Sequence, residues 1–155
     1  MANPLFRLAM WLTFERWAKR NSYQHIKTQI ETEAKIIHTS IQSATQNKVN
    51  HQTTTHIIGM ERWIQSRIKV ALGSPYIQEE YDNYRPPQNA SWEQLEQEFI
   101  ATRELSCELC DQLIAENIDK SLKVNHNQFG NITIGAWLEY LNFHSKTHAK
   151  SIKSD

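Results

Sequence analysis

The sequence predicts an all-α protein, an antiparallel four-helix bundle with an additional helix at its N-terminus. The 155 residues include only four glycines and four prolines, so few positions interrupt a helix. Four segments of about 20 residues repeat apolar side chains every three or four positions, and none alternates convincingly as a strand. Four helices that each bury one apolar stripe pack most simply as a bundle.

Residues 1–21 are predicted to be a helical extension that precedes a bundle domain of residues 22–155. Their apolar run, residues 8–12, follows Arg7 and is too short to cross a bilayer or to form a signal-peptide core. Three roles remain for this segment: a helix docked on the domain, which we favour, a dimer contact, or a helix on a membrane surface. The membrane-surface role is the least favoured of the three, and we expect a cytoplasmic protein.

The four bundle helices follow in order. The first is predicted over residues 22–44; a polar connector leads to the second, over residues 53–72, which Gly73 and Pro75 end. Residues 74–90, with three tyrosines, form a long loop of the kind that serves as a lid or pocket wall. Ser91 begins the third helix, with Gln94 completing a capping box. Thr133 is the predicted N-cap of the last helix, residues 134–152.

The composition excludes some functions. Lysine plus arginine and aspartate plus glutamate balance at 17 each, so no basic surface for nucleic acid is predicted. The two cysteines, Cys107 and Cys110, have CxxC spacing, but no second pair completes a zinc ligand set. Both fall within a predicted helix, and we interpret them as small packing residues in a reducing compartment.

His144 and His148 lie four residues apart in the last predicted helix, on one face and one turn apart, where they can hold one metal ion. The same face carries Ile134, Trp137 and Leu141, so we expect it to look inward. An unpaired buried polar group is costly, and a shared metal explains the pair. The alternative is a pair of core histidines satisfied by hydrogen bonds.

A third ligand is expected from a facing helix. His56, near the start of the second helix, shares its face with Met60 and Trp63 and is the best candidate. Gly59, three residues further on, either opens a pocket beside the imidazole or permits close packing.

Two strings of this chain, THIIGMERWIQSRI and FGNITIGAWLEYLNFHSKTHAKSI, flank the helix WEQLEQEFIATRELSCELCDQL. Together they resemble the DinB/YfiT-like superfamily of metal-dependent four-helix-bundle proteins, a group distinct from the DNA polymerase of similar name. The family pattern, a histidine early in the second helix and an HxxxH pair late in the fourth, matches His56, His144 and His148. The resemblance covers residues 22–153, and the apolar N-terminus departs from it.

Three imidazoles leave a divalent metal with open positions, which is the layout of a catalytic site, and they suit zinc, nickel or iron. Such a metal activates a coordinated water or thiol. The resemblance implies a hydrolase, or a transferase of low-molecular-weight thiols, acting on a small molecule, often as a homodimer. The alternative is a non-catalytic, stress-associated homodimer that binds metal.

The residues around the three histidines carry further expectations. Possible pocket-lining residues are Met60, Trp63, Trp137, Leu141 and Tyr84. Glu61 is expected to pair with a surface basic residue, and Arg67 to lie at a solvated helix end, with an anion clamp as its alternative. Glu139 and Tyr140 are expected to lie off the histidine face. His126 is expected to stabilise a turn or face solvent, and His25, His38 and His51 to lie on the surface.

Overall fold

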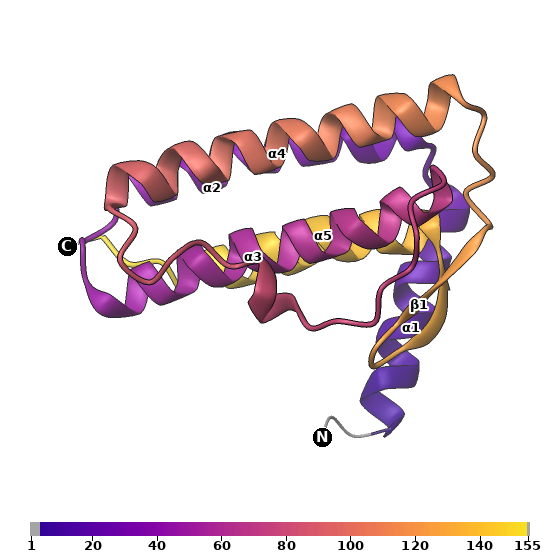
Figure 1. Ribbon diagram of the computed structural model, residues 1–155, viewed down its shortest axis with the longest axis horizontal. Coiled ribbons are helices and arrows are strands. Elements are labelled where there is room, and N and C mark those ends of the chain that lie inside the picture. The colour runs from indigo at the N-terminus through magenta and orange to yellow at the C-terminus, as the bar shows by residue number, and fades with distance from the viewer. Residues whose placement is uncertain (1–3, 155) are drawn as a thin grey trace.

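The computed structural model describes residues 4–154, without the side chains of residues 6 and 7. It is mostly helical, as predicted (Figure 1). The elements are α1 (Pro4–Arg20), α2 (Tyr23–Gln42), α3 (Lys48–Ala71), the short 3₁₀ helix η1 (Tyr81–Tyr84), α4 (Trp92–Ala115), β1 (Lys123–His126), β2 (Gly130–Thr133) and α5 (Ile134–Ala149).

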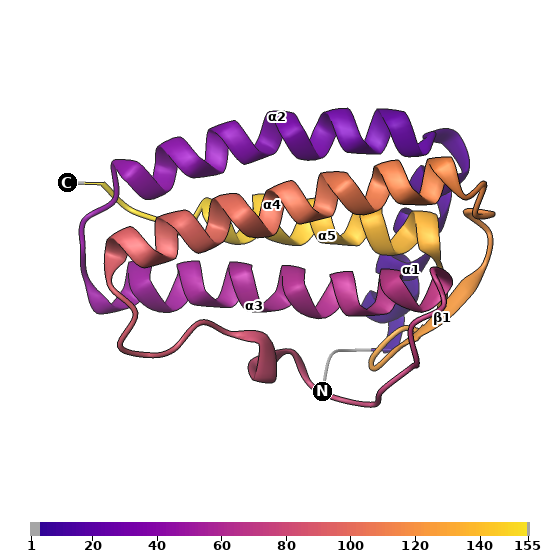
Figure 2. The same ribbon diagram turned by 45° about the horizontal axis from the view of Figure 1, so that its top comes forward.

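The four long helices α2 to α5 lie along one another. α2 packs on α4 and α3 on α5, and the pairs meet where α3 touches α4 and α2 touches α5. Figure 2 shows that α2 and α5 run in one direction and α3 and α4 in the other. α3 and α4 share a direction because the connection between them, residues 72–91, returns along the length of α3. Helix directions therefore do not alternate along the chain, as a simple up-and-down arrangement would require.

Helix starts follow the predicted capping chemistry. Ser91 and Gln94 form the expected capping box, and the Thr133 hydroxyl accepts from an N–H of the first turn of α5. The predicted start of the second bundle helix was five residues too late. Asn47 caps α3 instead, so most of the presumed polar connector is helical. The first turns of α3 bury the polar side chains Asn50, Thr54 and Thr55, which a search for apolar positions does not detect.

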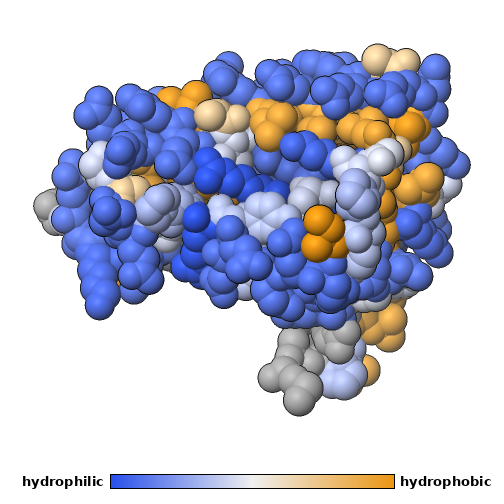
Figure 3. All heavy atoms as spheres, in the orientation of Figure 1, coloured by the Kyte–Doolittle hydropathy of each residue, from blue (hydrophilic) through white to orange (hydrophobic). Residues whose placement is uncertain are grey.

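The apolar stripes are buried as expected. α2 buries Ile26, Ile30, Ile37 and Ile41, and α4 buries Leu95, Phe99, Leu109 and Leu113. Each large side chain removed from water contributes about 1.5–3 kcal/mol to folding. The face seen in Figure 1 is mainly hydrophilic, with apolar side chains gathered over α4 and on α1 (Figure 3).

The β1–β2 hairpin contradicts the expectation of a strand-free chain. The two strands pair antiparallel, from Lys123 opposite Thr133 to His126 opposite Gly130, and Gly130 takes a positive φ of 72°. Each strand has four residues, so β1 offers only two inward positions, Val124 and His126. A single apolar residue cannot produce a recognisable alternation.

α1 is docked on the domain, the role we favoured. Phe14 is buried against Tyr140 and Phe143 of α5. The Glu15 carboxylate accepts from both the backbone N–H and the hydroxyl of Thr133, which ties α1 to the start of α5. Within residues 4–154, no helix is long and apolar enough to span a membrane.

Candidate metal centre

Three histidines from two facing helices come together at the α3–α5 contact. His56 extends from α3, and His144 and His148 extend from α5. One ring nitrogen of each lies within 4.8 Å of the other two, close enough for all three to bind one metal ion. The structure thus brings together the three histidines that were predicted as ligands.

The spacing suits coordination. Nε2 of His56 lies 3.2 Å from Nε2 of His144. Two nitrogens bound to zinc at 2.0–2.1 Å with a tetrahedral angle between them lie about 3.3 Å apart. The ring centroids of His56 and His144 lie 4.5 Å and 4.2 Å from that of His148, so the third imidazole completes a compact set.

A buried polar network holds α5 beside α3 next to this cluster. The Glu61 carboxylate on α3 accepts from Ser145 of α5 and from Ser106 of α4, and it pairs with Arg103 of α4 at 3.1 Å. The expectation that Glu61 pairs with a basic residue on the surface is wrong, because Glu61 and Arg103 are both buried. Since Ser145 follows His144, the network fixes the part of α5 from which that imidazole projects.

Burial keeps the three imidazoles neutral. It lowers the pKa of His144 to about 2, with His148 and His56 adding to the effect. The pKa of His56 falls to about 4, through burial first and then through His148 and the guanidinium of Arg85. Burial also lowers the pKa of His148. At neutral pH all three rings therefore carry a free lone pair, the form that binds metal.

The hydrogen bonds define the tautomers of the metal-free cluster. Arg85 lies 3.2 Å from Nδ1 of His56, and because a guanidinium only donates, that Nδ1 accepts and Nε2 carries the proton. His56 then donates to Nε2 of His144, whose own proton is left on Nδ1. Among the described residues this buried Nδ1 has no hydrogen-bond partner. An unsatisfied buried donor of this kind costs about 1–3 kcal/mol.

The predicted pocket-lining residues are placed mainly in the core. Met60, Trp63, Trp137 and Leu141 are all buried, and the two tryptophan rings pack edge to face. The Tyr84 hydroxyl donates to Glu79. The tyrosine beside the cluster is Tyr81, whose ring packs edge-on against His56 at 5.2 Å.

Sequence reasoning missed Arg85 as a neighbour of His56, and it considered Tyr81 only as one of three loop tyrosines at a pocket mouth. No spacing links residue 56 to residues 81 and 85, because the returning loop brings them together. The expectation for Tyr140 was also wrong. Tyr140, His144 and His148 follow one another at intervals of four residues, and the Tyr140 ring packs against His144 at 5.8 Å. Burial raises the pKa of this phenol.

Arg67 corrects another expectation. It is buried rather than solvated, and it donates to the backbone carbonyls of Ile77 and Glu79. Its role is to anchor the loop that returns along α3. Glu139 is also buried; Asn21 donates to it, and burial raises its pKa.

The remaining histidines lie outside the cluster. The Nδ1 of His126 accepts from two backbone N–H groups of the hairpin turn, so it stabilises a turn as expected, but it is buried against Trp137 and not exposed. His25 is exposed, while His38 pairs with Glu96 and His51 reaches a backbone carbonyl.

The cysteines behave as packing residues. Cys110 is fully buried and Cys107 half-buried, and both are free thiols. Burial raises the pKa of Cys107 to about 11 and that of Cys110 to about 12, which leaves them protonated at neutral pH.

Comparisons with protein-family models, curated proteins and solved structures find no match to this chain. The argument for its function therefore depends on the histidine cluster and its surroundings.

Proposed function

We propose that this chain is a DinB/YfiT-like protein in which α2 to α5 form a four-helix bundle, and that it is a metal-dependent enzyme. His56, His144 and His148 hold one divalent transition metal: zinc, nickel or iron. The observation that carries the proposal is the cluster itself, three neutral imidazoles with two Nε2 atoms 3.2 Å apart. The direction of the helices, with a long connection between α3 and α4, is compatible with a bundle that has one crossover.

The protein's own residues prepare the site. The neutral state of the three rings fits a metal, because each ring can give a lone pair to it, and coordination would replace the hydrogen bond between Nε2 of His56 and Nε2 of His144. Tyr81 packs edge-on against the His56 ring and Tyr140 against the His144 ring. A bound metal supplies a Lewis acid that activates a water or a low-molecular-weight thiol toward a small-molecule substrate.

The alternative is a homodimeric protein that binds metal without catalysis. One observation favours it. Among the described residues, the group of side chains that could hold a metal consists of three histidines and includes no carboxylate that could act as a general base. The two functions differ in whether the bound metal keeps an exchangeable position.

The test is metal content and coordination. Purified protein, loaded in turn with zinc, nickel and iron(II), is expected to hold about one equivalent by elemental mass spectrometry. The His144→Ala variant is expected to lose it, whereas His25→Ala, at an exposed histidine outside the cluster, is expected to keep it. Absence of metal in the wild type after loading would refute the proposal. In the cobalt(II) form, a visible spectrum that changes on adding imidazole indicates the open position that catalysis needs; an unresponsive spectrum indicates the non-catalytic alternative.

A further inference from the structure

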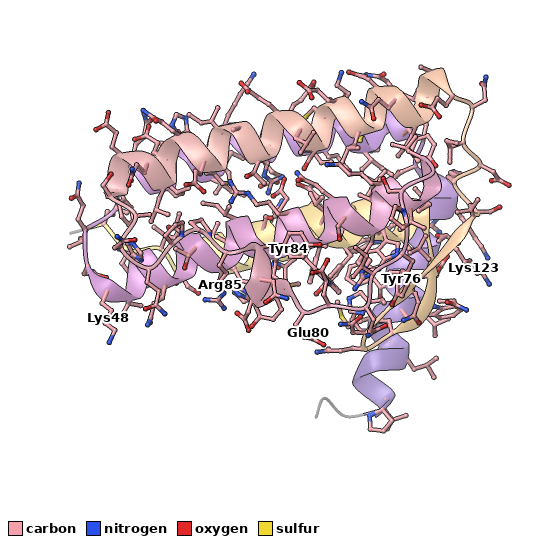
Figure 4. The ribbon with its side chains drawn as sticks, viewed as in Figure 1. Lys48, Tyr76, Glu80, Tyr84, Arg85 and Lys123 are labelled. Carbon is pink, nitrogen blue, oxygen red and sulfur yellow. The ribbon has the colours of Figure 1, made fainter. Side chains whose placement is uncertain are left out.

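Arg85 lies at the edge of the histidine cluster and is held there by its backbone. It directly precedes Pro86, and the residue before a proline is restricted to extended conformations. Arg85 has such a conformation, with φ −66° and ψ 145°. Figure 4 shows it beside α3, where the loop turns back toward α4.

Gly59 of α3 makes this position available. A Cβ at residue 59 would lie 2.6 Å from Cγ of Arg85 and 3.2 Å from its backbone N and Cα. Any larger residue would therefore push Arg85 away from the cluster. Of the two roles considered for Gly59, close packing is the one observed, and the packed partner is an arginine of the loop.

The present hydrogen bond of Arg85 is incompatible with a loaded metal. If Nε2 of His56 gives its lone pair to the metal, the neutral ring carries its proton on Nδ1. Two donors, that N–H and the Arg85 guanidinium, would then face each other at 3.2 Å. A bound metal would thus remove the acceptor that His56 offers to Nη2 of Arg85 and leave Nη2 with the Tyr81 hydroxyl, 3.4 Å away, so Arg85 would gain from a stronger acceptor beside the metal.

The charges around the cluster favour an anion as that acceptor. Asp82 is already paired with Nε of Arg85 at 2.8 Å and is itself largely exposed. The three histidines that could hold the metal are neutral, and no carboxylate belongs to their group. A divalent cation and a guanidinium side by side, with one exposed carboxylate, form a strongly positive site. A guanidinium also matches a carboxylate in geometry, through two parallel hydrogen bonds.

We propose that Arg85 is a substrate-binding residue of the metal site and that the substrate class is small molecules with a carboxylate group. The carboxylate would bind the Arg85 guanidinium, which would place the rest of the small molecule beside a metal held by the three histidines. This inference rests on the proposed metal site. It adds the chemical class of the ligand and the residue that selects it.

The test compares a charged and a neutral probe on cobalt(II)-loaded protein, followed by visible absorption. Acetate is the carboxylate probe, and imidazole binds the metal without a need for a guanidinium. Arg85→Gln is expected to weaken acetate binding about tenfold and to leave imidazole binding within about twofold. Gly59→Ala, which displaces Arg85 without removing its charge, is expected to weaken acetate binding in the same direction. Arg62→Gln is the matched control, because Arg62 has the same 31% side-chain exposure and its own carboxylate partner.

The outcomes separate this inference from the metal site. If wild-type protein takes up no cobalt, the metal site and this inference both fail. If cobalt binds but acetate does not, or binds equally to wild type and Arg85→Gln, the inference is overturned and the metal site stands. Equal weakening of acetate and imidazole would also overturn it, because Arg85 would then be acting on the metal ligands and not on the anion.

Discussion

The buried pair of Glu61 and Arg103 offers a sharp test of how the core is held together. Their side chains are 0% and 3% exposed, and Nε of Arg103 lies 3.1 Å from Oε2 of Glu61. Arg103 also donates to Asn142, while its Nη2 has no hydrogen-bond partner among the described residues. Removing one member of a buried pair leaves the other charge uncompensated, at a cost of about 3–5 kcal/mol. Arg103→Met is therefore expected to lower the free energy of unfolding by that amount.

The double variant separates the charge effect from packing. Glu61→Gln alone is expected to destabilise by a similar amount, since it leaves Arg103 as the unpaired charge. Glu61→Gln with Arg103→Met contains no buried charge and keeps both volumes, so it is expected to cost about 1 kcal/mol or less. The coupling energy, which is the sum of the two single costs less the cost of the double variant, is then at least about 5 kcal/mol, which identifies a direct interaction.

Urea unfolding followed by circular dichroism, in the presence of a chelator, measures these differences. Thermal midpoints are expected to fall by about 10 °C in each single variant, at 2–4 °C per kcal/mol for a chain of this size. Arg62→Met is the control, because its pair with Glu98 is partly exposed and worth about 1 kcal/mol at most. A free energy of unfolding for Arg103→Met within 1 kcal/mol of wild type would refute the reasoning.

Two further predictions concern the histidine cluster and the returning loop. Because the pKa values of His56 and His144 are lowered to about 4 and about 2, the unfolded chain binds protons below pH 6.5 that the folded chain refuses. The free energy of unfolding of metal-free protein is therefore expected to fall as the pH drops from 6.5 toward 4, by at most about 1.4 kcal/mol per pH unit for each histidine. The fall is expected to be less steep in His56→Gln, and a free energy of unfolding that does not change over this range would contradict the prediction. Arg67→Met, which removes the donors to the loop carbonyls, is expected to speed chymotrypsin cleavage within residues 74–90 at least tenfold, whereas Lys69→Met on the same helix is not.

The helices could be predicted from the sequence because each carries its own signal. Apolar positions every three or four residues mark α2 and α4, and Ser91 and Thr133 mark helix starts through local capping bonds. The three histidines were also accessible, since the HxxxH spacing depends on one helix and His56 shares the face of the facing helix that carries Met60 and Trp63. A feature that depends on the residues of one helix alone can be predicted from one sequence.

The buried charges could not be predicted for the opposite reason. Glu61, Arg67 and Arg103 have polar side chains at positions where a helix pattern assigns solvent, and each finds its partners outside its own helix. The hairpin was missed because four-residue strands carry too little alternation. Nothing local distinguishes these residues from exposed ones.

One structural cause accounts for the errors at Arg67 and Arg85. His56, Gly59, Trp63 and Arg67 form a stripe on α3, spaced by three or four residues. Each of them meets the loop that returns from α3 to α4: His56 and Gly59 meet Arg85, while Trp63 and Arg67 donate to loop carbonyls. The stripe faces covering backbone and not water, so amphipathic reasoning misjudges it. The same loop supplies the only guanidinium that contacts the histidine cluster within residues 4–154, and a change that loosens it, such as Arg67→Met, should also weaken carboxylate binding at the metal.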